Sequence, residues 1–94
     1  MTHDGDRIAL EGPLNLQTVP AVLQFGLESL GKGARIVDFK AVTEVDSSAL
    51  AMALEWVRAD AAAARKPALR FVHLPKGFVS LAQLYGVADL LPEG

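Results

Sequence analysis

The feature that most constrains the fold of this chain is a regular alternation of strand-like and helix-like segments, separated by glycine and proline. Three runs are short, apolar and bounded by glycine or proline, as strands are. Three longer runs place apolar residues at helical spacing, so that each has one apolar face. The sequence therefore predicts strands over 7–12, 34–40 and 68–74, and helices over about 18–31, 47–65 and 77–87.

This order of elements predicts an α/β fold. Strand, helix and strand in succession favour parallel pairing through a right-handed crossover, with the helices packed against the sheet. The chain has 94 residues, so we expect one domain over 1–94, built on a small parallel or mixed sheet. In such sheets functional loops gather beyond the carboxyl ends of the strands, which we place after Leu10, Phe39 and Val72.

Composition and charge exclude several classes of function. The formal charge is −2, and the nine Lys and Arg residues are scattered rather than grouped in a basic stripe, which argues against nucleic acid as a partner. The chain has no cysteine, so disulfides, thiolate metal sites and cysteine catalysis are excluded. No apolar run approaches the roughly 20 residues that span a bilayer, and the N-terminus is polar. These features predict a soluble cytoplasmic protein without direct membrane insertion.

One polar seam stands out, where the second predicted strand gives way to the second helix. Asp46, Ser47 and Ser48 lie there in succession. Asp and Ser are preferred helix N-caps, and an acidic residue beside the first turn interacts favourably with the helix dipole, by about 0.3–1 kcal/mol. No Glu or Gln follows at the third position after any of the three, so the capping box is incomplete. A cap explains one or two of these residues, and a functional role for the rest stays open.

Helical spacing adds an apolar stripe to this seam. Met52 and Trp56 fall in line with Ser48, on the side of the helix that we expect to face away from the sheet. Trp is enriched at binding hot spots and Met provides adaptable apolar surface, but a neighbouring helix could instead cover the stripe within the domain. We favour an exposed partner-binding surface made of Asp46, Ser47, Ser48, Met52 and Trp56. The residues expected to face the sheet are Leu50, Ala53, Leu54, Val57, Ala61 and Ala64.

The sequence contains no convincing catalytic or metal-binding group. A nucleophilic serine needs a base such as histidine within hydrogen-bonding reach, and the chain has only His3, near the terminus, and His73, in a predicted strand. The sequence has no nucleophile elbow, phosphate loop or dinucleotide fingerprint, and two separate histidines do not make a metal site. We therefore expect a non-enzymatic protein without a cofactor or a metal.

A phosphate on Ser47 or Ser48 would nevertheless have physical consequences. It would add about −1.5 to −2 charges and strong acceptor oxygens at the start of the helix. Glu44 and Asp46 would repel it. Such a modification would change binding with little need for the fold to change.

Two stretches resemble the STAS domain family, which includes the anti-sigma factor antagonists. One is LEGPLNLQTVP, which is similar to the first strand, the Gly-x-Leu-Asp/Asn turn and the first helix of that family. The other is ARIVDFKAVTEVDSSAL, which is similar to its central strand and its Asp-Ser-Ser/Thr-Gly-Leu loop, with Ala49 where the family often has glycine. The resemblance implies a STAS fold over nearly the whole chain, although the short N-terminus leaves little room for the leading strand that many members have.

Within this family, the resemblance implies two candidate functions. The C-terminal stretch LPKGFVSLAQLYGVADLLP resembles the small cytoplasmic STAS subunit (MlaB-like) of Mla-type phospholipid ABC transporters. That resemblance implies binding and support of the transporter's ATPase, a role in outer-membrane lipid asymmetry, and a location peripheral to the inner membrane through the partner. In that subunit, the hydroxyl directly after the aspartate matters to the contact with the ATPase, and the corresponding residue in this chain is Ser47.

The alternative that the resemblance implies is an anti-sigma factor antagonist. Such a protein binds a kinase-like anti-sigma factor and accepts a phosphate on a hydroxyl of the same loop, here Ser47 or Ser48. A third hypothesis is direct lipid binding in an apolar pocket between the sheet and the helices, which nothing in the sequence specifically requires.

Overall fold

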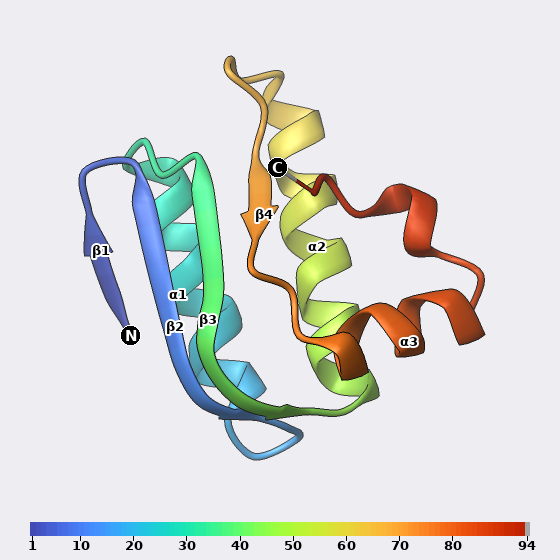
Figure 1. Cartoon of the computed structure of the whole chain (residues 1–94). Helices are drawn as coiled ribbons and strands as arrows, with labels where there is room; N and C mark the ends of the chain where they lie inside the picture. The colour runs from blue at the N-terminus through green and yellow to red at the C-terminus, as the bar shows by residue number, and fades with distance from the viewer. Residues whose placement is uncertain (94) are drawn as a thin grey trace.

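The computed structural model describes residues 1–93 and contains a four-stranded sheet with its helices packed on one face (Figure 1). The strands lie in the order β1-β2-β3-β4, with β1 antiparallel to β2 and the other neighbours parallel. The sheet is therefore mixed, the predicted α/β fold is confirmed, and the three predicted helices are present. The elements are β1 (Thr2–Asp4), β2 (Arg7–Leu14), α1 (Val19–Gly31), β3 (Ile36–Val45), α2 (Ser47–Ala63), β4 (Arg70–Val72), α3 (Lys76–Leu84) and a short 3₁₀ helix, η1 (Ala88–Leu90).

Aromatic packing joins the last helix to the sheet. Alternation along β3 turns Val37 and Phe39 toward the helices, and both are at most 1 % exposed. The Phe39 ring centroid lies 5.5 Å from that of Phe71 in β4 and 5.3 Å from that of Phe78 in α3. Full burial of one such side chain contributes roughly 1.5–3 kcal/mol, so this cluster accounts for much of the attachment of α3.

The first two predicted strands are longer than expected. The pairing of β2 with β3 has two irregularities, one between Ala9 and Glu11 and the other between Gly12 and Pro13, and the second accommodates the Gly-Pro pair that we expected to end β2. Both strands therefore continue, and their carboxyl ends lie at Leu14 and Val45 rather than at Leu10 and Phe39. The third predicted strand, by contrast, shortens to the three residues of β4.

The N-terminal residues form a strand that the sequence analysis missed. β1 and β2 are joined by the two-residue turn Gly5-Asp6, in which Gly5 has a φ of 61°, as tight hairpin turns need. Three residues suffice for an edge strand paired in this way. The expectation that the short N-terminus leaves little room for a leading strand is therefore wrong.

A buried ion pair joins the start of β3 to the end of α2. Arg35 Nη1 lies 2.7 Å from Asp60 Oδ1, and both side chains are less than a tenth exposed. The same guanidinium donates to the carbonyl oxygen of Pro67 at 2.9 Å, and Asp60 Oδ2 accepts the backbone N–H of Leu69 at 3.0 Å. The pair therefore also fixes the segment that leads into β4.

Trp56 and Met52 are buried, so the prediction that they form an exposed stripe is wrong. They are 0 % and 2 % exposed, because α1 packs across this side of α2. The indole lies against the α1 backbone at Gly26, where a Cβ atom would stand 2.2 Å from the ring. Its Nε1 donates to the carbonyl oxygen of Leu23 at 3.1 Å. A neighbouring helix covers the stripe within the molecule, which is the alternative that the sequence left open.

Burial along α2 also corrects the face that was assigned to the sheet. Leu50 and Ala53 are buried as expected, but Ala61 and Ala64 are exposed. The helix is therefore rotated about its axis relative to the prediction, so that Met52 and Trp56 face the interior. The buried residues of α2 are Ala49, Leu50, Met52, Ala53, Trp56 and Asp60.

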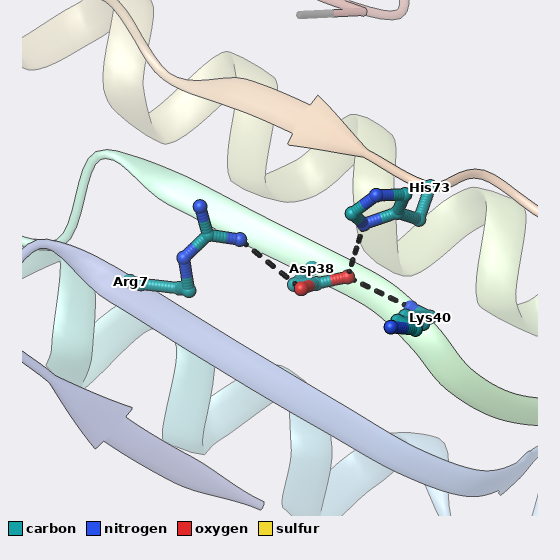
Figure 2. Close-up of polar contacts among 4 residues, drawn as sticks. All are labelled: Arg7, Asp38, Lys40 and His73. Atoms are coloured by element: carbon teal, nitrogen blue, oxygen red, sulfur yellow. Dashed lines mark hydrogen bonds and ion pairs between the residues drawn. The ribbon is translucent and has the colours of Figure 1, made fainter.

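The sheet face opposite the helices carries ionic contacts between its strands. Figure 2 shows Asp38 of β3 between Arg7 of β2 and His73, which directly follows β4. Arg7 Nη1 lies 3.1 Å from Asp38 Oδ2, and His73 Nδ1 lies 2.9 Å from Oδ1, which also accepts the backbone N–H of Lys40 at 2.9 Å. Partial burial raises the pKa of Asp38, but the contacts with Lys40, His73 and Arg7 outweigh it, so this pKa lies below its ordinary value.

The contact between α1 and Trp56 predicts that Gly26→Ala destabilises the protein. The added Cβ collides with a large buried ring, and overpacking of this kind costs about 1–3 kcal/mol in the free energy of unfolding. Gly31→Ala is the matched control, because it lies in the same helix and its Cβ would meet nothing within 4 Å. Urea titrations of both variants measure the difference, and equal stabilities would contradict the packing described.

The contacts of Asp38 predict a stability that depends on pH. Because its pKa is lowered in the folded protein, its contribution to stability is fully present above the ordinary value of 3.8 and is lost as the pH falls through the lower, folded value. Asp38→Asn should therefore reduce the free energy of unfolding at pH 7, and its difference from the wild type should shrink as the pH falls below 3.8, as measured by urea titration. Asp89→Asn, at an exposed aspartate, is the control. A deficit of Asp38→Asn that is independent of pH would count against this role.

Candidate functional site

The polar seam lies where the carboxyl ends of β2 and β3 meet the start of α2, at the bottom of Figure 1. Leu14 and Val45 are paired at the ends of the two strands. The backbone N–H of Asp46 donates to the carbonyl oxygen of Leu14 at 3.2 Å. The segments that follow the two strands are therefore held side by side.

The segment between β2 and α1 is fixed by its own side chains. Asn15 Oδ1 accepts the backbone N–H groups of Gln17 at 2.9 Å and Thr18 at 3.2 Å. The Thr18 hydroxyl donates to the carbonyl oxygen of Pro13 at 3.0 Å, so Thr18 occupies the N-cap position of α1 without a capping bond from its side chain. These bonds leave Leu16 78 % exposed at the tip of the segment.

Asp46 is the N-cap of α2. Its Oδ1 accepts the backbone N–H of Ser48 at 2.8 Å and also the Ser48 hydroxyl. The Ser48 hydroxyl is the strongest influence that lowers the pKa of Asp46; removal from water opposes it, and the N–H groups of Ser48, Ala49 and Leu16 add to the lowering. The carboxylate is therefore ionised at neutral pH, next to the positive end of the helix dipole.

The two serines of the seam have different surroundings. Ser48 is half-buried, and its hydroxyl is occupied by the bond to Asp46. Ser47 is exposed in the first turn of α2. Of the three residues in the seam, Asp46 and Ser48 thus organise the helix start, and Ser47 presents a hydroxyl at the surface.

An apolar groove begins at Ser47 and takes the place of the stripe expected at Met52 and Trp56. It lies between α2 and the chain that follows α3, and it has a volume of about 270 Å³. Leu50 forms part of it, and Tyr85, at its side, is 57 % exposed. The lining residues are Ser47, Leu50, Ala51, Leu54, Tyr85 and Val87.

Sequence analysis missed Leu16, Leu54 and Tyr85 as surface residues of this site. Leu54 was assigned to the sheet, and Tyr85 fell inside the helix predicted over about 77–87. That helix ends at Leu84, which lets the next residue turn outward toward α2. The signal for this end is Gly86, which has a φ of 70°, the left-handed conformation that favours glycine after a helix.

The two histidines make contacts elsewhere in the fold. His73 contacts Asp38 on the open face of the sheet, and His3 Nε2 lies 2.9 Å from the carbonyl oxygen of Gly5. Within residues 1–93, no group of three or more His, Cys, Asp or Glu side chains could hold a metal ion. None of the helices in this same range is both long and apolar enough to cross a membrane.

Comparisons with known proteins agree with this geometry. Among solved structures, the fold is similar to one described as "Structure of the Anti-Sigma Factor Antagonist SpoIIAA in its Unphosphorylated Form", with a TM-score of 0.70 and 17 % sequence identity, over 99 % of this chain and 82 % of that one. A likeness at this identity shows the fold alone. No curated protein matches the sequence. A family model described as "Mlab, STAS domain" matches residues 1–92, and the chain therefore belongs to the STAS domain family.

Proposed function

We propose that this protein is a non-enzymatic subunit that binds and supports the ATPase of an Mla-type phospholipid-transport ABC complex, and so serves outer-membrane lipid asymmetry. It would lie in the cytoplasm, peripheral to the inner membrane through that partner. STAS domains act as protein–protein interaction modules. The observation that carries the proposal is the exposed hydroxyl of Ser47, on a helix start that Asp46 and Ser48 hold in place.

The geometry around Ser47 suits a contact with another protein. A hydroxyl can both donate and accept a hydrogen bond, so it can pair with main-chain or side-chain groups of a partner. The bonds that organise the helix start are made by its neighbours, so Ser47 need not give up a bond to bind. Leu16 on one side and the groove on the other add apolar surface, as the centres of interfaces require.

Two features support the transporter over other STAS roles. The family model that matches residues 1–92 carries the description "Mlab, STAS domain". The C-terminal stretch that resembles the Mla-type subunit contributes Tyr85 and Val87 to the groove beside Ser47. Tyr85 and Val87, which belong to the stretch that carries the resemblance, therefore lie on the same surface as the Ser47 hydroxyl.

A binding subunit can influence an ATPase without chemistry of its own. If the ATPase exchanges between conformations, a subunit that contacts one of them more favourably shifts the population toward it, by as much as the difference in binding free energy. A partner that binds only the folded ATPase also raises its apparent stability. Either effect requires a surface that holds its shape, which the capped start of α2 provides.

Ser47→Arg should abolish co-purification with the ATPase while the domain stays folded. The substitution places a long charged side chain at the exposed first turn of α2, where it disrupts contact without entering the core. Ser80→Arg is the matched control, because this serine is also exposed on a helix but lies outside the groove. Affinity pull-down, with circular dichroism melting of both variants, makes the measurement. A Ser47→Arg complex with full ATPase activity would show that the surface is wrong.

The alternative function is a phospho-regulated antagonist that binds a kinase-like anti-sigma factor. The specific observation in its favour is again the exposed hydroxyl of Ser47. The solved structure with the similar fold is described as an anti-sigma factor antagonist, which makes this role a reasonable second candidate. A phosphate on Ser47 would meet favourable N–H groups at the helix start and repulsion from Asp46 and Glu44.

The antagonist hypothesis predicts that a cognate kinase and ATP add one phosphate, at Ser47. Ser48 should remain unmodified, because its half-buried hydroxyl is bonded to Asp46. Mass spectrometry of the wild type, Ser47→Ala and Ser48→Ala locates the phosphate, and Ser47→Asp should lose binding to the kinase. No incorporation into the wild type would exclude this alternative.

A further inference from the structure

We infer that the groove beside Ser47 receives a large apolar side chain of the ATPase, on a segment that carries arginine or lysine next to it. This inference rests on the proposed function and specifies the chemistry of the partner's contact surface. It follows from the shape of the groove, the charges around it and the aromatic ring at its side.

The groove is apolar and its walls are held by the fold. Leu50 is 4 % exposed and belongs to the core, so this part of the wall cannot move away. Ala51 is exposed and small, which leaves the space open above it. Leu54 and Val87 are half-buried and complete an apolar lining around a volume of about 270 Å³. A space of this kind suits an aliphatic or aromatic anchor, as protein interfaces commonly use.

The charges around the groove are acidic. Four acidic residues and no basic residue lie within three positions of a lining residue in the sequence. Glu55 is paired with Arg58, which lies just outside that range. Arg58 lies one helical turn beyond Leu54, so its charge and that of Glu55 offset each other at this part of the groove. Among the described residues, Glu44, Asp46 and Asp89 form no ion pair, so their negative charges are not offset by a basic side chain.

These features favour a basic partner over an acidic one. The carboxylate of Asp46 offsets the positive end of α2, so the helix start does not present a net attraction for anions. Tyr85 offers an exposed ring at the side of the groove, and a cation over a tyrosine face is attracted to it. An apolar side chain flanked by arginine or lysine matches both the apolar lining of the groove and the acidic residues around it. An anionic lipid headgroup or an acidic peptide would meet repulsion.

Filling the groove tests the apolar part of the inference. Ala51→Leu occupies the space, while Ala62→Leu places the same side chain on an exposed position near the other end of α2. Leucine is nearly as favourable as alanine in helices, so both variants should fold, which thermal melting checks. Calorimetric titration with the purified ATPase should show binding weakened about tenfold or more for Ala51→Leu and within about twofold of wild type for Ala62→Leu.

Reversing one charge tests the electrostatic part. Asp89→Lys should weaken binding at low salt, and the deficit should shrink at high salt, where exposed charges are screened. Asp4→Lys on β1 makes the same charge change at an exposed site outside the groove and should leave binding unchanged. Equal affinities of Asp89→Lys and Asp4→Lys would overturn the basic character assigned to the partner.

The outcomes separate this inference from the proposed function. If Ser47→Arg abolishes binding and Ala51→Leu binds as the wild type does, the groove is not the contact and the proposed function stands. If Ser47→Arg binds as the wild type does, the proposed function fails. If Ala51→Leu instead converts a dimer to a monomer in sedimentation, the occupant is a second copy of this chain, and the inference is overturned.

Discussion

The packing of the Trp56 indole on the backbone of α1 is the contact on which the rest of the structure depends. Because Gly26 has no side chain, the helices approach closely enough for the indole N–H to reach a main-chain carbonyl oxygen. This contact sets the rotation of α2 about its axis, and the rotation decides which residues of α2 face outward. Ser47, Ala51 and Leu54 line the outer groove because the opposite side of the helix is committed to α1.

The start of α2 is held in a different way, by polar contacts among residues close in sequence and by the ends of two strands. The bond from the Asp46 N–H to Leu14 fixes the height of the helix start relative to the sheet, and the Asp46 carboxylate organises the first turn. These bonds are made by other residues, and together they fix the position of Ser47. A surface that is ordered before binding loses less conformational entropy when a partner arrives.

Sequence reasoning succeeded where the determining residues are neighbours in the chain. Apolar spacing predicted the three helices, and residue type predicted a cap at the Asp46 seam. The same spacing showed that Met52 and Trp56 share a face of the helix. Which element covers that face depends on the tertiary fold, because α1 is distant from α2 in the sequence. A glycine inside a helix, here Gly26, is the one local sign of such a close approach. The groove depends on where α3 ends relative to α2, and the difference between the two serines depends on which hydroxyl reaches Asp46.

The buried pair of Arg35 and Asp60 has a consequence for how sequences with this fold diverge. Removing one partner leaves an uncompensated charge in the interior and costs about 3–5 kcal/mol, a large part of the total stability of a small protein. Replacing both residues with apolar side chains of similar volume is often tolerated. Evolution from the ionic pair to an apolar pair therefore requires changes at both positions. Residues 35 and 60 should covary across related genes.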